Sequence, residues 1–279
     1  MSDNIEVPPG QIWITTYGAI TVETTQSLVL LQRRIAELGI KNLDIRFAVG
    51  TLVDKARNEA AAHMLSNPQN SYLWFIDADM TFQPQLLDTM LKTAFADCKW
   101  ADIVGAYCQL RGKPYLPTID TGTGTWEAWT AGQGPLEVIR TGAACVLIKR
   151  QVFEKLEYPW YGIRPTPRPL DMLAEVDNFA RVKFDGRNPF MQLPEWEQLL
   201  TCAREDARSK PPGKSVQQYQ TVGEDSSLCD KAKAAGFRIV VDTNAVCGHI
   251  DRKIIQPQDH ADAMKEVRVS EDAAVGIIA

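Results

Sequence analysis

The first 110 residues alternate between short apolar runs and longer amphipathic segments, and this alternation constrains the fold more than any other feature. In the longer segments, apolar residues recur at helical spacing. The expected strands are 12–16, 43–49, 71–76 and 103–107, and the expected helices between them are 24–38, 52–65 and 85–96. Strands that alternate with helices build βαβ units, so we expect an α/β protein with a mainly parallel central sheet flanked by helices.

The α/β pattern is interrupted after residue 112 and returns near the C-terminus. The interruption is expected to contain short antiparallel strands, then an apolar run, a helix and an irregular insertion that holds many of the prolines. These segments are, in order, 116–140, 143–148, 151–156 and 158–222, with helix around 193–209 inside the insertion. A helix at 224–235 and a strand at 237–241 then resume the pattern.

The charge balance excludes a general affinity for polyanions. The chain carries 30 Lys and Arg against 35 Asp and Glu, a formal net charge of −5, which gives no overall attraction to DNA, RNA or an anionic membrane. The N-terminus lacks the basic start and apolar core of a signal peptide, and the apolar runs are too short for a bilayer. We expect no membrane span and a soluble, cytoplasmic protein.

Six cysteines are scattered along the chain without a CxxC pair. A chain of 279 residues does not need disulfides to stabilise its core, so most of these cysteines are expected to be reduced and buried. Cys247 and His249 have the spacing of half a zinc site. A structural zinc takes four ligands, however, and the sequence shows no second pair.

Two carboxylates, Asp77 and Asp79, directly follow the buried, apolar strand at 71–76. Because they are one residue apart, their side chains point to the same side, at the edge where open α/β sheets bind ligands. Such a pair suits a hard divalent cation, which prefers oxygen ligands. The alternative is that both carboxylates only hydrogen-bond the turn into the next helix.

Further motifs stand in a particular order around this pair. Ala56-Arg57-Asn58 precedes it, Gly223-Glu224-Asp225 begins the last helix, and His249 follows the last strand. Together they resemble the GT-A glycosyltransferases, the nucleotide-sugar-dependent enzymes related to family 2. The resemblance extends from Ile12 to Ile250 apart from the insertion. The sequence is also similar to glycosyltransferases encoded by bacteriophages.

The resemblance implies one GT-A (Rossmann-like) domain over residues 1–279. A nucleotide-sugar-binding half (11–110) would precede an acceptor half (111–250, including the insertion) and a C-terminal tail (251–279). The implied reaction moves a sugar from a nucleoside-diphosphate sugar, with a UDP-sugar as the expected donor, to an acceptor hydroxyl. For a phage-encoded enzyme, the host cytoplasm would be the place of action.

The resemblance also implies roles for single residues. Asp79 and His249 would bind the metal, and Asp77 the metal or the ribose. With one imidazole among oxygen ligands, Mn²⁺ is favoured over Mg²⁺. Asp225 is the candidate general base, which would make the reaction inverting. The other candidates for donor binding are Thr15, Thr16 and Tyr17 at the base, Arg57 at the diphosphate, and Ala78 and Gly142.

Each of these side chains has a plainer interpretation. Glu224 and Asp225 would cap the helix that they begin, and His249 would be a structural histidine. Arg57 would be a solvated helix residue, and Tyr17 an aromatic at the edge of the core. Four further aromatic residues either stack on a sugar or base, or simply pack: Trp126, Trp129, Trp160 and Tyr161.

Two other functions compete with glycosyl transfer. A sugar-phosphate nucleotidyltransferase would carry a glycine-rich, basic loop after the first strand, but residues 16–20 offer one glycine and no basic residue. A non-catalytic nucleotide-sugar-binding module would keep the motifs without turnover. The acceptor stays open among a hydroxymethylated DNA base, a glycan and a protein. The basic residues of the insertion permit a polyanionic acceptor or are simply solvated. Because the insertion leads into Asp225, we expect it to face the acceptor.

Overall fold

A computed structural model of the chain describes residues 7–49, 52–162, 164–166, 196–198, 200–201, 220–250, 254–255 and 257–258. The chain divides into two compact units. The larger comprises Met1–Gly162 and Glu224–Ala279, and the smaller comprises Ile163–Gly223. Most of the expected insertion, most of its helix around 193–209 and most of the tail 251–279 lie outside the described residues.

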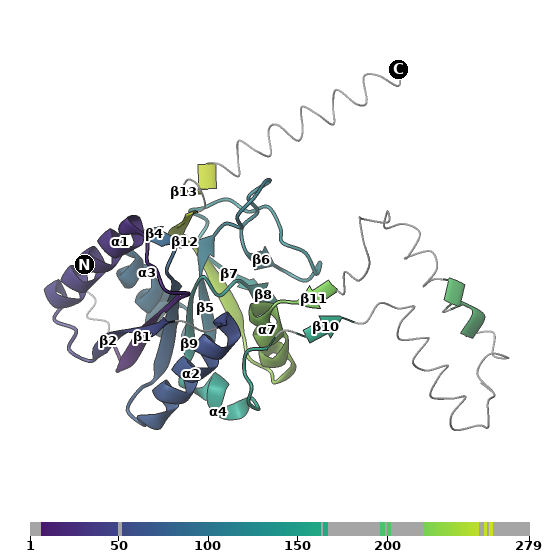
Figure 1. Cartoon of the computed structure of the whole chain (residues 1–279), viewed down its shortest axis with the longest axis horizontal. Coiled ribbons are helices and arrows are strands. Elements are labelled where there is room, and N and C mark those ends of the chain that lie inside the picture. The colour runs from purple at the N-terminus through teal and green to yellow at the C-terminus, as the bar shows by residue number, and fades with distance from the viewer. Residues whose placement is uncertain are drawn as a thin grey trace, which may run out of the picture. The chain divides into compact units, whose positions relative to one another are not determined.

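The larger unit follows the expected α/β pattern (Figure 1). Its N-terminal elements are β1 (Gly10–Thr16), α1 (Val22–Glu37), β2 (Leu43–Val49), α2 (Val53–Ser66), β3 (Tyr72–Asp77), β4 (Met80–Phe82), α3 (Leu86–Lys92) and β5 (Ile103–Cys108). After them come β6 (Ile119–Asp120), β7 (Pro135–Val138), β8 (Arg140–Thr141), β9 (Cys145–Lys149), α4 (Arg150–Lys155), α7 (Glu224–Ala234), β12 (Ile239–Ile250) and β13 (Ile254–Ile255).

The central sheet has the strand order β13-β12-β5-β9-β3-β1-β2, with β4 and β7 also paired to β12. Strands β2, β1 and β3 are parallel, as are β5 and β12, while β9 is antiparallel to its neighbours β3 and β5. Strands β6 and β8 form a small separate antiparallel sheet. The predicted fold class, α/β with a mainly parallel central sheet and a small antiparallel part, is confirmed.

Both faces of the sheet are buried, as the apolar strand β3 requires. Tyr72, Trp74 and Ile76 point to the layer of α1 and α3, while Leu73 and Phe75 point to the layer of α2, α4 and α7 (Figure 1). All five are fully buried because successive side chains of a strand face opposite sides. This packing fixes β3 in the centre of the molecule and delivers Asp77 to the carboxyl edge of the sheet.

Local signals in the sequence determine where the helices begin and end. The Thr21 side chain accepts a hydrogen bond of 3.1 Å from the Thr24 backbone N–H, which caps the start of α1. Gly39 after α1 and Gly236 after α7 have φ of 67° and 88°, a conformation that glycine adopts without strain.

Three elements differ from the sequence-based expectation. The helix expected over 85–96 is α-helical only to Lys92 and continues as a π-helix over Thr93–Asp97. Strand β4 was not expected. The last strand is longer than 237–241 because its pairing to β5 is interrupted between Asp242 and Val246 and then resumes. His249 therefore lies inside β12 rather than after it.

Five cysteines, Cys98, Cys108, Cys145, Cys229 and Cys247, are free and buried, as expected for reduced core residues. Cys202 lies outside the described residues. Where the structure is described, no helix is long and apolar enough to span a membrane. In the smaller unit, β10 (Arg164–Thr166) pairs antiparallel with β11 (Gln220–Val222).

Candidate active site

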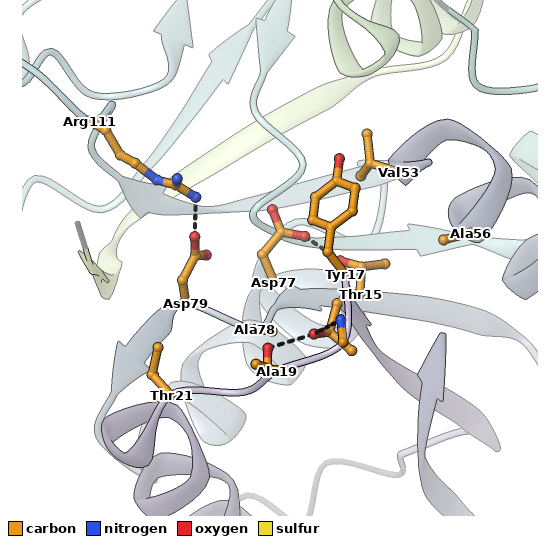
Figure 2. A pocket seen from close by; sticks show the side chains of 12 residues that line it. Thr15, Tyr17, Ala19, Thr21, Val53, Ala56, Asp77, Ala78, Asp79 and Arg111 are labelled. Atoms are coloured by element: carbon orange, nitrogen blue, oxygen red, sulfur yellow. Dashed lines mark hydrogen bonds and ion pairs between the residues drawn. The ribbon is translucent and has the colours of Figure 1, made fainter. Parts of the chain in front are cut away.

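A cavity of about 520 Å³ opens at the carboxyl edge of the sheet, where β1 and β3 end side by side (Figure 2). Thr15 on β1 is in register with Asp77 on β3, and the Ala78 backbone N–H donates to the Thr15 carbonyl at 3.0 Å. The residues around the cavity are Thr15, Thr16, Tyr17, Gly18, Ala19, Thr21, Val53, Ala56, Asp77, Ala78, Asp79 and Arg111. Four of the predicted donor-binding residues, Thr15, Thr16, Tyr17 and Ala78, are therefore together with both aspartates of the pair.

Strand β4 brings Asp79 to His249. After the turn at Ala78 and Asp79 the chain reverses, and Met80 on β4 pairs with His249 on β12. The Ile250 backbone N–H also donates to the Asp79 carbonyl at 2.8 Å. As a result, the Asp79 carboxylate oxygen Oδ2 lies 3.5 Å from Nε2 of His249.

Arg111 is the residue that the sequence analysis missed. It lies three residues after the end of β5, and its guanidinium forms an ion pair with Asp79 (Figure 2). Its Nε also donates to His249 Nε2 at 2.9 Å. The available signal was its position, because the loop that follows a parallel strand meets the same carboxyl edge as Asp77 and Asp79.

Hydrogen bonds define the state of His249. Nδ1 lies 2.8 Å from the Gln109 carbonyl, which only accepts, so Nδ1 carries a proton. Arginine only donates, so Nε2 presents its lone pair to Arg111. In this hydrogen-bond arrangement the imidazole is the neutral tautomer, and Nε2 lies between Arg111 and Asp79.

The pKa values of this pair move in opposite directions. Burial lowers the pKa of His249, but the Asp79 carboxylate and the Gln109 carbonyl outweigh it, so the pKa lies above its ordinary value. Burial raises the pKa of Asp79, but His249 and Arg111 outweigh it, and the pKa lies below its ordinary value. Asp79 is therefore ionised across the neutral range.

Arg57 occupies a different place from the one expected. Its side chain is 3 % exposed and is not among the residues that line the cavity. Its Nη2 donates to both carboxylate oxygens of Asp77, at 2.9 and 3.1 Å, and Nη1 forms an ion pair with Glu224. The interpretation of Arg57 as a solvated helix residue is wrong, and its burial against two carboxylates argues against the expected contact with a diphosphate.

The same contacts involve Asp77. Arg57 and the Thr15 hydroxyl both donate to its carboxylate, which also lines the cavity. Asp77 therefore holds Arg57 in this geometry, and its role as a ligand of the metal or the ribose stays a prediction. Burial lowers the pKa of Arg57, but the charges of Asp77 and Glu224 raise it by more, so the pKa lies above its ordinary value and the guanidinium is permanently charged.

Glu224 and Asp225 begin α7 but are held differently. Burial raises the pKa of Glu224 above its ordinary value, although the charge of Arg57 lowers it in part. The Asp225 carboxylate accepts a hydrogen bond of 2.6 Å from the Ser226 backbone N–H at the start of the helix. The capping interpretation thus applies to Asp225, and catalysis by its second oxygen is compatible with it.

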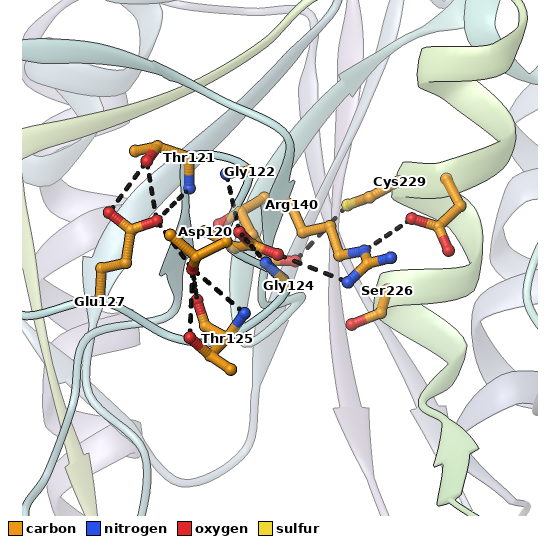
Figure 3. Close-up of polar contacts among 12 residues, drawn as sticks. Asp120, Thr121, Gly122, Gly124, Thr125, Glu127, Arg140, Ser226 and Cys229 are labelled. Atoms are coloured by element: carbon orange, nitrogen blue, oxygen red, sulfur yellow. Dashed lines mark hydrogen bonds and ion pairs between the residues drawn. The ribbon is translucent and has the colours of Figure 1, made fainter. Parts of the chain in front are cut away.

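A second polar network fixes the orientation of α7 (Figure 3). Arg140 on β8 donates from Nε to Asp230 on α7 at 2.6 Å and pairs with buried Asp120 at 3.4 Å. The Asp120 carboxylate also accepts from the backbone N–H groups of Gly122 and Gly124, at 2.9 and 3.1 Å. The loop after β6 and the helix that carries Asp225 are thereby tied to one arginine.

The remaining predicted residues divide between the cavity and the core. Thr16 forms a turn by donating to the Ala19 carbonyl at 2.6 Å, and Tyr17 is 74 % exposed above the cavity. Gly142 is buried outside the cavity lining, and a Cβ there would lie 2.9 Å from Thr118. The aromatic residues Trp160 and Tyr161 are buried, so they pack rather than stack on a ligand.

A divalent cation fits Asp79 and His249. Within the described residues, no three His, Cys, Asp or Glu side chains are grouped as a metal site. Asp79 nevertheless has a buried oxygen, Oδ1, without a hydrogen-bond partner. Two ligand atoms that bind one cation at about 2.1 Å lie about 3 to 3.5 Å from each other. This matches the 3.5 Å between the other carboxylate oxygen of Asp79, Oδ2, and His249 Nε2.

No protein-family model matches the chain, and no curated protein is detectably similar in sequence. Similar solved structures include A197 from STIV, at 17% identity and a TM-score of 0.43 over 55% of this chain and 71% of that one. A glycosyltransferase involved in glycosylation of the major capsid of PBCV-1 matches at 10% identity and a TM-score of 0.30, covering 73% and 80%.

GalNAc-T7, solved with UDP, GalNAc and Mn²⁺, matches at 9% identity and a TM-score of 0.45, covering 93% of this chain and 48% of that one. Glycosyltransferases and nucleotidyltransferases are thus both among the matched structures. Likenesses this distant assign no activity, so the function has to be inferred from the site.

Proposed function

We propose that the chain is a metal-dependent glycosyltransferase of the GT-A type, which moves a sugar from a nucleoside-diphosphate sugar to an acceptor hydroxyl. One observation carries the proposal. The Asp79 carboxylate and the lone pair of His249 Nε2 converge to 3.5 Å beside a cavity of about 520 Å³ at the carboxyl edge of the sheet. One imidazole with a carboxylate suits Mn²⁺, or Mg²⁺ with more retained water.

The cavity supports binding of the donor. Thr15 and Thr16 offer hydroxyl groups, Tyr17 offers an exposed ring on which a nucleobase can stack, and Ala78 lies in the lining. A divalent cation held by Asp79 and His249 would neutralise the charge that develops on the leaving diphosphate. We expect UDP as the nucleotide.

Asp225 is the proposed general base, which accepts the proton of the attacking hydroxyl and gives inversion at the anomeric carbon. Its neighbour Glu224 is held by Arg57, which in turn binds Asp77 at the end of β3. Arg57 therefore acts as a positioning residue, because it joins the start of α7 to the strand that carries the aspartate pair.

The acceptor half is proposed to include the smaller unit, Ile163–Gly223, in the single-domain arrangement expected from the sequence. Its acceptor is a hydroxymethylated DNA base, a glycan or a protein. Deletion of this unit should abolish transfer and spare hydrolysis of the donor. Equal loss of both activities would contradict a role in acceptor binding.

A sugar-phosphate nucleotidyltransferase is the second candidate. The loop after β1 lines the cavity with Tyr17, Gly18 and Ala19 and brings no basic side chain to it. A triphosphate would need such a residue, so the loop favours a diphosphate donor whose charge a cation neutralises. Incubation with sugar phosphate and nucleoside triphosphate separates the two, because only a nucleotidyltransferase releases pyrophosphate.

The test of the class is a screen of UDP-, GDP- and TDP-sugars for hydrolysis with Mn²⁺. Asp79→Asn should lower turnover about 100-fold or more, since several kcal/mol of charge stabilisation are lost. Asp44→Asn is a matched control, because Asp44 is exposed on β2. Unchanged turnover in Asp79→Asn would refute the proposal, and saturable UDP binding without turnover would favour a non-catalytic module.

A further inference from the structure

Arg111 takes the two atoms that the proposed cation needs. Its guanidinium is ion-paired with Asp79 Oδ2, and its Nε–H donates to His249 Nε2 at 2.9 Å. These are the oxygen and nitrogen that lie 3.5 Å apart and fit a single cation. In Figure 2 the side chain of Arg111 extends from its loop directly to Asp79.

The two occupants exclude each other at His249. A neutral imidazole has one lone pair, on the nitrogen that carries no proton. Because Nδ1 faces the Gln109 carbonyl at 2.8 Å and holds the proton, that lone pair is on Nε2. It can accept the N–H of Arg111 or bind a cation, but it cannot do both.

Arg111 is able to leave. Its side chain is 52 % exposed, whereas those of Asp79 and His249 are 24 and 14 % exposed. It lies in the loop after β5, next to Gly112, whose φ is 92°. Asp79 and His249 are instead held by backbone pairing between β4 and β12, so a cation would meet a preformed pair of ligands.

We propose that Arg111 is a built-in competitor for the cation site: it neutralises Asp79 and orients His249 when no metal is bound, and a divalent cation must displace it. The inference rests on the cation site of the proposed function. It assigns the residue a role in setting metal affinity rather than in the chemical step.

The experiment measures Mn²⁺ affinity from the electron paramagnetic resonance signal of free Mn²⁺, on the full chain without nucleotide. Arg111→Gln should bind Mn²⁺ about two- to fivefold more tightly than the parent, the range expected when a partly exposed ion pair is lost. Arg111→Lys should lie between them, because a lysine pairs with Asp79 but lacks the planar fork. A gain in affinity cannot result from damage to the fold.

Arg33→Gln is the matched control. It removes the same charge from an exposed position on α1 and should leave Mn²⁺ affinity unchanged. If Arg111→Gln binds Mn²⁺ no more tightly than the parent, and Asp79→Asn still abolishes Mn²⁺ binding, competition by Arg111 is refuted but the cation site is retained. Absence of Mn²⁺ binding in the parent and in Arg111→Gln would overturn both.

A second readout follows Arg111 itself. The ¹⁵N resonance of its Nε–H, assigned by its absence in Arg111→Gln, should shift when diamagnetic Mg²⁺ is added, because the hydrogen bond to His249 is lost. A resonance that stays unchanged at saturating Mg²⁺ would overturn displacement.

Discussion

Arg57 and Glu224 are 167 positions apart in the sequence, yet their side chains form a largely buried ion pair. The same guanidinium binds both oxygens of Asp77. One arginine on α2 therefore connects the end of the central strand with the start of the helix that carries the proposed base.

Replacing Arg57 should destabilise the fold strongly. Arg57→Met leaves Asp77 and Glu224 partly buried without their counter-charge, which costs about 3 to 5 kcal/mol when a buried pair is broken. The measurement is the free energy of unfolding in urea. Arg33→Met, on an exposed face of α1, is the control and should change it by less than about 0.5 kcal/mol. A loss below about 1 kcal/mol in Arg57→Met would contradict the central role of this cluster.

Tyr17 should contribute to nucleotide affinity without contributing to stability. Its ring is 74 % exposed at the cavity, and stacking of a base on an aromatic side chain is worth about 1 to 3 kcal/mol. Tyr17→Ala should weaken UDP binding about five- to 100-fold in calorimetric titrations, by the tenfold change per 1.4 kcal/mol. Tyr17→Phe should retain most of the affinity.

Tyr158→Ala provides the matched control for Tyr17. Tyr158 is 69 % exposed but packs near Trp160, away from the residues that line the cavity. This variant should bind UDP as the parent does. A similar loss in both variants, or no loss in Tyr17→Ala, would remove Tyr17 from the nucleotide site.

Gly142 should prove to be a packing requirement. An alanine Cβ at this position would lie 2.9 to 3.1 Å from the side-chain atoms of Thr118, and both residues are buried. Gly142→Ala should therefore lower stability by about 1 to 3 kcal/mol, the usual cost of overpacking, measured by thermal unfolding. Gly162→Ala is the control, since nothing lies within 4 Å of its added Cβ. An unchanged melting temperature with impaired donor binding would instead place Gly142 at the donor sugar.

The buried cysteines should resist alkylation at alkaline pH. Burial raises the pKa of Cys229 to about 12, and because the thiolate is the reactive form, the thiol stays protonated and unreactive at pH 8 to 9. In a Cys202→Ser background, iodoacetamide at about pH 8 should label none of the five buried cysteines until urea unfolds the chain. Mass spectrometry of the native and unfolded protein measures this. Labelling of Cys229 in the native state would show that α7 opens.

The positions of most helices and strands were predictable because they depend on local periodicity. The segments expected at 12–16 and 24–38 are present as β1 and α1 with small shifts at their ends. Strand β4 was missed because three residues give no detectable pattern. The full length of β12 was missed because its pairing with β5 breaks at Asp242 and resumes at Val246, which only the neighbouring strand determines.

The sequence by itself determined that this chain forms an α/β sheet and that two aspartates stand at the carboxyl edge of its central strand. Only the tertiary structure decided which arginine side chain pairs with each aspartate. Arg57, 20 positions from Asp77, reaches it from helix α2, whereas Arg111, 32 positions from Asp79, reaches it from the loop after β5. Periodicity reports which face a side chain occupies, whereas the pairing of charges depends on which segments pack together at that edge.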